Sequence, residues 1–273
     1  MSEMNLEEIR EHWKKWANDF GTDIRATTKT STAKKIELGN LIRVFEKLIK
    51  NNAGSINVLE AGCGNGHNLF MLAKTYPQVN FSGFDYIEEM ITNASKTKSE
   101  LALNNINFFH DDLLKPEKQD FKYDIIFTVR ALINLNSDEL QGSAIANLSK
   151  MLKQNGYLVL LENTVENFAK QNKARNRIGL SDREPSKFNH FVNENYIESV
   201  LIDNGLTVLE KIDFMGLHDL ILYVLIPKIN RGVVDYDNPL VHAATELTLN
   251  MSQSEIQNFE NFGQNRMFIC QKN

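Results

Sequence analysis

The chain has 273 residues, of which 42% are hydrophobic and 24% charged, and its formal net charge is −5. This length can bury a sizeable core in one large α/β domain, and the composition is that of a globular protein, which excludes long disordered stretches. A mildly acidic chain without a stripe of Lys and Arg cannot neutralise many phosphates. The expected partner is therefore a small-molecule substrate and not nucleic acid.

The two cysteines, Cys63 and Cys270, lie far apart and indicate neither a disulfide framework nor a metal-binding CxxC pair. Residues 1–16 are charged and helical in pattern, unlike a secretory signal. The most apolar run, residues 217–227, is much shorter than the ~20 residues that span a membrane, and we interpret it as a buried or interfacial helix. We expect a cytoplasmic protein that does not bind membranes, and a homodimer is one assembly that the sequence allows.

Residues 1–50 carry helical patterns and are expected to form an N-terminal lid. Beyond them, short β-branched or aromatic runs alternate with longer amphipathic stretches, which is typical of βαβ units around a parallel sheet. The expected strands are residues 56–60, 80–84, 106–110, 124–129 and 157–162. The expected helices between them are residues 67–75, 87–103 and 137–153.

The rest of the chain continues this pattern less regularly. We expect a helix over residues 192–204, a sixth strand over residues 207–214 and a final strand over residues 266–272. Residues 215–263 are too long for a hairpin and, with residues 166–191, are interpreted as substrate-cap insertions.

The predicted fold class is therefore α/β. It is a Rossmann-like, doubly wound, mostly parallel seven-stranded sheet with helical cap insertions. We expect a single domain over residues 1–273, in which residues 51–165 form the cofactor-binding core.

The clearest local signal is a glycine-rich turn between a strand and a helix. Residues 58–66 read VLEAGCGNG, so an apolar strand runs directly into Gly62, Gly64 and Gly66. Glycines at alternate positions let the backbone turn sharply and approach a ligand more closely than side chains would permit. The pattern is GxGxG and no pyrophosphate-binding glycine follows, so a dehydrogenase with a nicotinamide cofactor fits less well.

Acidic residues stand at the ends of three successive strands. Glu60 precedes the glycines, where a carboxylate can accept a hydrogen bond from a ligand ammonium. Asp85 follows the second strand, at the distance typical of a residue that binds ribose hydroxyls. Asp111 follows the third strand, where a carboxylate can accept from the exocyclic amine of an adenine. Together these positions describe a site for an adenosine that carries an amino acid.

At these residues the chain resembles the class I S-adenosylmethionine-dependent methyltransferase family, whose first motif is an acidic residue followed by GxGxG, here EAGCGNG. The resemblance covers residues 40–165 and includes the segments FDYIEEM, DIIFTVRALINL and LKQNGYLVLLENT. The N-terminal HWKKWANDFG also looks like the aromatic lid of members that act on small molecules.

The resemblance implies S-adenosyl-L-methionine as the cofactor. It places the methionine part at the glycine loop, the ribose at Asp85, the adenine at Asp111 and the lid at Trp13. The cofactor-binding residues that it implies are Trp13, Glu60, Gly62, Cys63, Gly64, Asn65, Asp85, Tyr86, Met90, Asp111, Asp112, Leu113 and Val129.

Five residues are candidates for a role in catalysis. Arg130 follows the apolar fourth strand at the ligand-binding edge, so it either pairs with an internal carboxylate such as Glu162 or contacts an anionic substrate. If the acceptor is a hydroxyl, a base would help, and Glu162, His190, His218 and His12 are the candidates. No spacing of His, Cys, Asp or Glu indicates a metal site.

The expected activity is O-methylation of a sugar, a nucleotide-linked sugar or a phosphorylated precursor in surface glycan (polysaccharide) biosynthesis, because the caps and the RALINL and LENT segments look like a sugar-tailoring subgroup of the family. An anionic acceptor would require a positive clamp, for which Arg130 with Arg175, Arg177 or Arg231 would be suitable. The alternatives are N-methylation of a small amine, which would favour aromatic and acidic cap residues, and a non-catalytic protein that binds the cofactor.

Overall fold

The structure is a computed structural model that describes residues 4–50, 55–117, 121–257 and 262–273. Its strands are β1 (Asn57–Ala61), β2 (Asn80–Asp85), β3 (Ile106–His110), β4 (Tyr123–Val129), β5 (Leu152–Asn163), β6 (Leu206–Asp213) and β7 (Asn265–Lys272). Its α-helices are α1 (Leu6–Phe20), α2 (Ser31–Lys50), α3 (His67–Thr75), α4 (Glu88–Glu100), α5 (Asp138–Met151), α6 (Val165–Arg177), α7 (Glu194–Asp203), α8 (Gly216–Leu220), α9 (Ile226–Ile229), α10 (Pro239–Asn250) and α11 (Gln253–Gln257).

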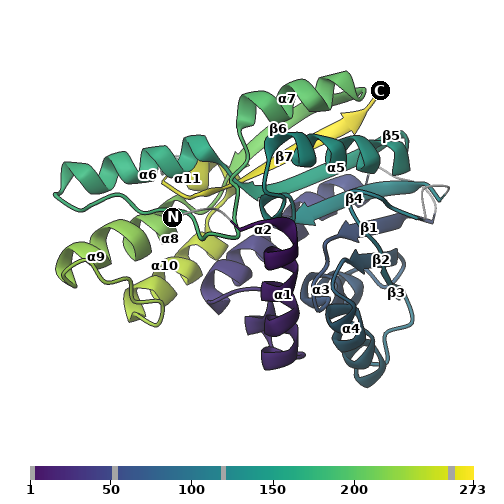
Figure 1. Ribbon diagram of the computed structural model, residues 1–273, viewed down its shortest axis with the longest axis horizontal. Helices are drawn as coiled ribbons and strands as arrows, with labels where there is room; N and C mark the ends of the chain where they lie inside the picture. The colour runs from purple at the N-terminus through teal and green to yellow at the C-terminus, as the bar shows by residue number, and fades with distance from the viewer. Residues whose placement is uncertain (1–3, 51–54, 118–120, 258–261) are drawn as a thin grey trace.

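The strands form one seven-stranded sheet in the order β3-β2-β1-β4-β5-β7-β6. β7 runs antiparallel to both of its neighbours, and the other pairs are parallel. The predicted seven-stranded, mostly parallel sheet is therefore confirmed. Helices cover both faces of the sheet, while α8, α9 and α10 lie together at one end of the molecule (Figure 1).

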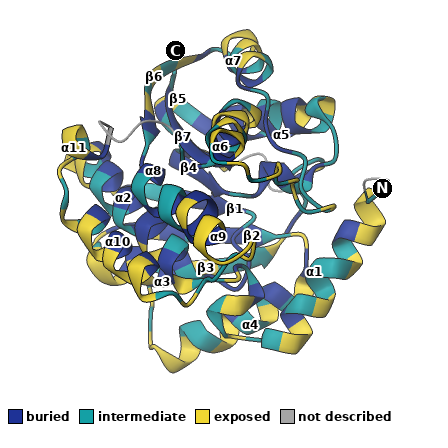
Figure 2. Ribbon diagram, turned by 90° about the vertical axis from the view of Figure 1, so that its left-hand side faces the viewer, coloured by how far each residue is buried: buried dark blue, intermediate teal, exposed yellow. Residues whose placement is uncertain are grey.

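The sheet has a hydrophobic core on each face because successive side chains of a strand point to opposite sides. On one face Val58 and Ile125 pack with α2 and α3, and on the other Leu59 and Ile126 pack with α5 and α7. Figure 2 shows the strands as largely buried and the outer sides of the helices as exposed.

The strand order reverses between β1 and β4. The helix after β1 packs on one face and the helix after β4 packs on the other. The two connections therefore leave the sheet in opposite directions and open a crevice at the carboxyl ends of these strands, where ligands of such sheets bind.

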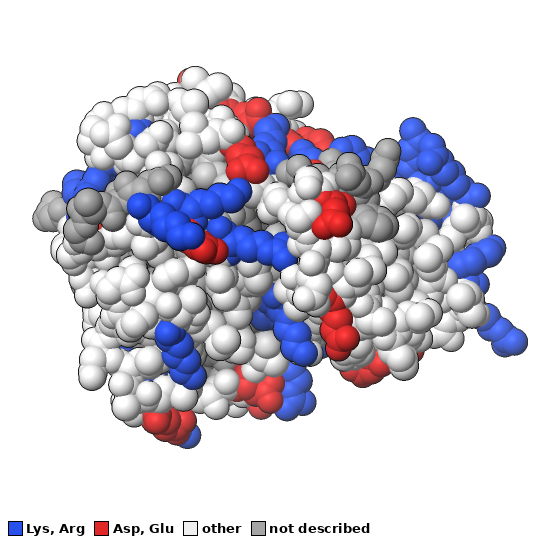
Figure 3. Space-filling view, turned by 180° about the vertical axis from the view of Figure 1, so that it is seen from behind, with Lys and Arg blue, Asp and Glu red and all other residues white. Residues whose placement is uncertain are grey.

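The expected insertions are only partly helical: residues 166–191 contain most of α6 and then an irregular segment, and residues 215–263 contain α8, α9, α10 and α11. Residues 217–227 form α8, a π-helical turn (η3, Ile221–Leu225) and the start of α9, with Leu222 and Ile226 buried. Residues 51–54 of the expected core and 258–261 of the second insertion lie outside the described residues. No helix in the described part of the chain is both long and apolar enough to cross a membrane. On the face seen from behind, Lys and Arg side chains are interspersed with Asp and Glu (Figure 3).

Candidate functional site

A cavity of about 350 Å³ lies at the carboxyl ends of β1, β2, β4 and β5. Its volume is within the range of small-molecule sites. α1 and α2 close it on one side, and residues 183–191 with η3 close it on the other. Every residue expected to bind the cofactor lines this cavity, namely Trp13, Glu60, Gly62, Cys63, Gly64, Asn65, Asp85, Tyr86, Met90, Asp111, Asp112, Leu113 and Val129.

The glycine loop needs glycine for two reasons. Gly62, Gly64 and Gly66 all have positive φ, at 74°, 52° and 82°, and this left-handed region is costly for residues with a Cβ. A Cβ on Gly62 would also lie 2.6 Å from the Cβ of Ala131, and one on Gly64 would lie 2.5 Å from a methyl group of Thr27. The loop therefore packs directly against the segment after β4 and against the N-terminal lid.

Glu60 reaches the cavity from β1 with one carboxylate oxygen free. Its Oε1 accepts a hydrogen bond from the side chain of Asn68, whereas its buried Oε2 has no partner among the described residues. Burial raises the pKa of Glu60 to about 8, and the nearby ammonium of Lys34 opposes this shift. A buried acceptor without a partner is costly, so this oxygen fits a ligand that brings a positively charged donor.

The two aspartates have different surroundings. Asp85 accepts hydrogen bonds from the backbone N–H of Gly64 (2.7 Å) and of Ile87 (2.9 Å), so it orders the glycine loop as well as lining the cavity. Asp111 accepts through Oδ1 from two backbone N–H groups, while its buried Oδ2 has no partner among the described residues. Asp111 thus offers a free acceptor where the sequence predicted an adenine contact.

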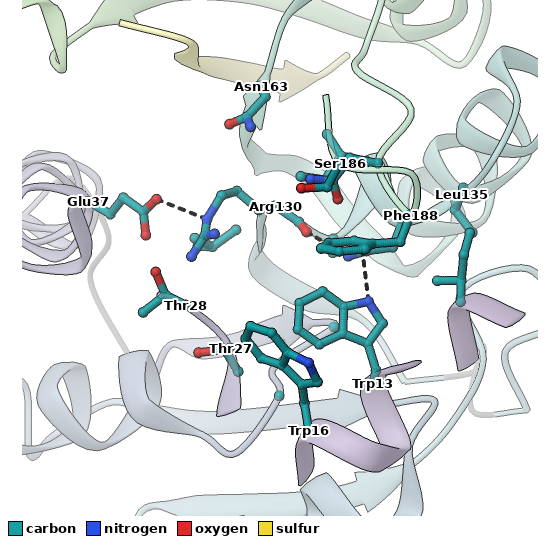
Figure 4. A pocket seen from close by; sticks show the side chains of 18 of the residues that line it. Trp13, Trp16, Thr27, Thr28, Glu37, Arg130, Leu135, Asn163, Ser186 and Phe188 are labelled. Atoms are coloured by element: carbon teal, nitrogen blue, oxygen red, sulfur yellow. Dashed lines mark hydrogen bonds and ion pairs between the residues drawn. The ribbon is translucent and has the colours of Figure 1, made fainter. Parts of the chain in front are cut away.

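The N-terminal lid is tied to the cavity by side-chain hydrogen bonds. The indole N–H of Trp13 donates to Asn134 Oδ1 at 3.0 Å (Figure 4). The amide of Asn65, in the glycine loop, donates to the carbonyl oxygens of Gly21 (3.2 Å) and Asp23 (2.8 Å). Trp13 lines the cavity, and its role as part of a lid over the cofactor stays a prediction.

Arg130 is paired with a carboxylate that the sequence did not suggest. Its Nε lies 3.0 Å from Oε1 of Glu37, a buried residue of α2 (Figure 4). Of the two alternatives that the sequence left open, the structure shows pairing with an internal carboxylate, but that carboxylate is Glu37 and not Glu162, which was given as an example. The backbone of Arg130 has a positive φ of 54° and donates to Leu161 O at 2.8 Å. Such strain in a residue other than glycine is typical of functional positions.

Glu162 does not line the cavity in the described part of the chain. It is buried and accepts hydrogen bonds from Thr128 Oγ1 (2.7 Å) and from the backbone N–H of Ala131 and Leu132 (both 3.2 Å). Sequence reasoning placed it at the strand end but could not show that the turn after β4 folds over it. Glu162 therefore holds the turn that follows Arg130.

The two candidate histidines also lie off the cavity. His218 is fully buried between Asp219 (2.8 Å) and Thr32 (3.1 Å). His190 bonds Asp138 at 2.7 Å and lines a second hollow beside α6. Of the five catalytic candidates, only Arg130 lines the main cavity. His12 is not among the lining residues either, although its ring stacks on Phe188 with centroids 4.2 Å apart.

The lining residues that sequence reasoning missed include four with ionisable side chains, Lys34, Glu37, His67 and Arg183. Lys34 and Glu37 are buried one turn apart on α2, with Nζ 3.9 Å from Oε2, and burial lowers the pKa of Lys34. Burial and Lys34 lower the pKa of His67 to about 4, so this ring is neutral at pH 7. For Lys34 and Glu37, the available signal was that polar residues occur on the buried face of the α2 helix.

The cap arginines named from the sequence are not at the site. Arg175 is buried and donates to the backbone carbonyls of Ser181 and Tyr223. Arg177 and Arg231 are exposed and do not line the cavity. Among the residues that the structure describes, no group of His, Cys, Asp or Glu could hold a metal ion.

A glycine cradle and acids at three neighbouring strand ends define a nucleoside-binding α/β protein. Residues 52–211, more than half of the chain, match the family described as methyltransferase domain. The chain therefore belongs to this methyltransferase family, and the cofactor of its class is S-adenosylmethionine. The free oxygens of Glu60 and Asp111 fit the amino-acid ammonium and the adenine amine of that cofactor.

Three relatives align over part of the chain. An uncharacterized protein of Rickettsia prowazekii is 30% identical over 118 residues, 43% of this chain and 47% of that protein. Protein-lysine N-methyltransferase EFM4 of Saccharomyces cerevisiae is 34% identical over 89 residues, 32% and 39% of the two chains. Malonyl-[acyl-carrier protein] O-methyltransferase of Bacillus anthracis is 27% identical over 120 residues, 44% and 42% of the two chains. The aligned part is less than half of each relative.

Solved structures share the fold over nearly the whole chain. Magnesium protoporphyrin IX methyltransferase of Synechocystis PCC 6803, with bound SAH, has a TM-score of 0.59 and 17% identity, covering 98% of this chain and 100% of that one. The [4+2]-cyclase SpnF has a TM-score of 0.65 and 15% identity, covering 100% and 97%. At these identities the likeness shows the fold alone.

Proposed function

We propose that this protein transfers the methyl group of S-adenosylmethionine to an oxygen of a small acceptor. One observation carries the proposal. A single cavity joins the expected cofactor residues at β1, β2 and β3 to polar side chains at the ends of β4 and β5, Arg130 and Asn163. The buried Oδ1 of Asn163 has no partner among the described residues, so it can accept a hydrogen bond from the substrate that receives the methyl group.

When bound, the cofactor supplies an electrophilic methyl carbon. The chain then has to align the acceptor with that carbon and exclude water. Glu60 and the glycine loop hold the amino-acid end, while Trp13 and Asn65 hold the lid over the site. We call the part of the cavity at the ends of β4 and β5 its acceptor half. Arg130, oriented by Glu37, faces this half (Figure 4).

The need for a base depends on the acceptor. A carboxylate or phosphate oxygen is already a nucleophile, whereas a neutral hydroxyl needs a group to accept its proton. The neutral ring of His67 is the lining histidine available for that role. We propose positioning roles for the other candidates: Glu162 holds the turn after Arg130, His218 holds Asp219 and His190 holds Asp138.

The acceptor class proposed from the sequence, a sugar, a nucleotide-linked sugar or a phosphorylated precursor for surface glycans, suits the polar edge formed by Arg130 and Asn163. N-methylation of a small amine is a second candidate because Tyr223, Tyr236 and Asp219 also line the cavity, and aromatic faces attract cations.

The test measures binding and turnover separately. Thermal shift with S-adenosylhomocysteine is compared with NADH, and isotope-labelled S-adenosylmethionine is then supplied with panels of sugar nucleotides, sugar phosphates and amines. We expect stabilisation by S-adenosylhomocysteine alone and label in an oxygen acceptor. Transfer of the label to amines alone would indicate N-methylation instead of O-methylation. Tight binding of S-adenosylhomocysteine without turnover on any acceptor would indicate a non-catalytic protein that binds the cofactor.

A pair of variants controls the binding measurement. Gly64→Ala puts a Cβ into the left-handed region and against Thr27, which costs about 1–2 kcal/mol for the conformation alone and should weaken binding. Gly205 also has a positive φ, 72°, but nothing lies within 4 Å of its missing Cβ, so Gly205→Ala should leave the affinity unchanged.

A further inference from the structure

Arg183 lines the cavity beside Phe168 of α6 and Tyr223 of η3, and its guanidinium has no anionic partner among the described residues. Within the described residues, no carboxylate oxygen lies within 4.0 Å of its nitrogens. The other two arginines that line the cavity are paired, Arg130 with Glu37 at 3.0 Å and Arg10 with Glu7 at 3.8 Å. A half-buried cation next to an apolar wall is costly unless something neutralises it.

Arg183 is nevertheless held in one orientation. Its guanidinium carbon lies 3.6 Å from the ring centroid of Tyr223 and 5.4 Å from that of Phe168. Its Nη1 donates to Oε1 of the buried Gln171, whose own amide donates to Phe262 O at 2.7 Å. Asn172 fixes the backbone of Arg183 by accepting from its N–H and donating to its carbonyl. The group is therefore positioned before any ligand arrives.

This positioning leaves donors free for an anion. A guanidinium carries five N–H donors, and Gln171 uses one of them. Anions with two adjacent oxygens, such as planar carboxylates and tetrahedral phosphates, bind the remaining fork with two parallel hydrogen bonds. The surrounding wall is aromatic, with Phe168, Phe188 and Phe191 among the lining residues.

We propose that Arg183 anchors the anionic group of the acceptor, a carboxylate or phosphate, while the aromatic wall holds an apolar part of the same molecule. The inference rests on the proposed function and narrows its acceptor to an anion with a flat apolar body. Arg183 selects the acceptor, and Arg130 with Asn163 lies at the strand ends where the methyl group arrives.

The test uses 1-naphthoate as an anionic probe and 1-naphthamide as its neutral counterpart, titrated by calorimetry into the protein saturated with S-adenosylhomocysteine. We expect naphthoate to bind about tenfold more tightly than naphthamide, which corresponds to about 1.4 kcal/mol, because a hydrogen bond to a charged group is stronger than one to a neutral group. Arg183→Gln should abolish this preference. Arg177→Gln, on the exposed end of α6, should leave it intact.

Two further measurements test the proposal even if the Arg183→Gln variant does not fold. Inorganic phosphate should compete with naphthoate on the unaltered protein and leave naphthamide binding unchanged. Arg183→Lys keeps the charge but loses the planar fork, so a reduced preference is expected. The proposal would be overturned if the unaltered protein bound both probes equally or bound neither of them. It would also be overturned if Arg183→Gln kept the preference for naphthoate.

The two proposals fail in different ways. If the unaltered protein did not bind S-adenosylhomocysteine, the proposed function would be contradicted. The preference for naphthoate over naphthamide can still be measured in the absence of S-adenosylhomocysteine. In methyl-transfer assays with an anionic acceptor, Arg183→Gln should raise KM about tenfold or more with a small change in kcat. A purely structural role for Arg183 would instead lower the melting temperature without altering the preference for the anion.

Discussion

Glu60 shows how one residue can serve a cationic ligand from a buried position. Its carboxyl is 1% exposed and has a free oxygen. Its pKa is raised from 4.5 to about 8, mainly by burial. The ligand-free protein therefore holds a proton on Glu60 at neutral pH that the unfolded chain has lost. The tighter binding of this proton in the folded state contributes to the free energy of unfolding. The contribution is complete below pH 4.5 and is lost as the pH rises toward 8.

Binding of a ligand ammonium should remove the proton from Glu60, because the ammonium stabilises the ionised carboxylate. We predict the release of about one proton when S-adenosylhomocysteine binds at pH 7, and an affinity that increases up to about pH 8. Calorimetry in phosphate and Tris buffers, which differ in ionisation enthalpy, measures the proton release.

Glu60→Gln should bind the ligand about tenfold more weakly and without proton release. Burial also raises the pKa of Glu162, to about 7, but Glu162 lies off the cavity. Glu162→Gln should therefore still release the proton, and equal release from both variants would contradict the assignment of Glu60.

At the scale of elements, α2 does more than close the site. One of its faces packs Ile36, Leu41 and Phe45 into the core of the sheet. Its first half also carries buried Lys34 and Glu37 into the cavity. Glu37 binds Arg130 and also accepts from the side chain of Asn265 at 2.9 Å. The helix thereby couples the end of β4 to the start of β7.

We predict that Glu37→Gln weakens both stability and acceptor binding. The variant leaves Arg130 without its counter-charge, and removing one partner of a buried pair costs about 3–5 kcal/mol, less where the replacement still forms hydrogen bonds. Thermal unfolding and KM are the two measurements. Glu46, on the same helix, forms an exposed pair with Lys50, so Glu46→Gln should change neither, and comparable losses in both variants would exclude the role of Glu37.

At the scale of the molecule, the caps and the core share walls. The cavity is lined by residues of α1, α2, the β-strand ends, α6 and η3, so its integrity needs all of them. Aromatic contacts such as Trp13 with Phe188, whose centroids are 5.5 Å apart, join segments far apart in the sequence.

We predict one cooperative unfolding transition for the entire chain. S-adenosylhomocysteine at about 100 times its dissociation constant should stabilise the protein by about 2.7 kcal/mol, because it binds the folded state alone. Differential scanning calorimetry with and without ligand checks this. Two transitions, of which the ligand shifts only one, would show that the caps unfold separately from the core.

The features predicted correctly are local in the chain. The strands and their order of appearance follow from alternating apolar runs, and β1 runs into Gly62, Gly64 and Gly66 in both the prediction and the structure. Glu60, Asp85 and Asp111 line one cavity because neighbouring parallel strands bring their carboxyl ends to one edge, and their roles toward the cofactor stay a prediction.

The features that were missed depend on which distant element packs across the cavity. Glu162 and His218 looked available from their positions, but the turn after β4 and helix α2 bury them. Arg175 and Arg183 are similar residues of one cap, and packing alone turns the first inward to the backbone and the second toward the cavity.

The amino-acid sequence by itself therefore determined the sheet, the glycine cradle and the acidic strand ends, because these follow from the short-range patterning of single strand–turn–helix units. Only the tertiary structure decided the acceptor half of the site, where Glu37 neutralises Arg130 and Arg183 stands against Tyr223 without a counter-charge. Pairing and burial between distant segments depend on how the caps close over the sheet, and residue spacing carries no information about that closure.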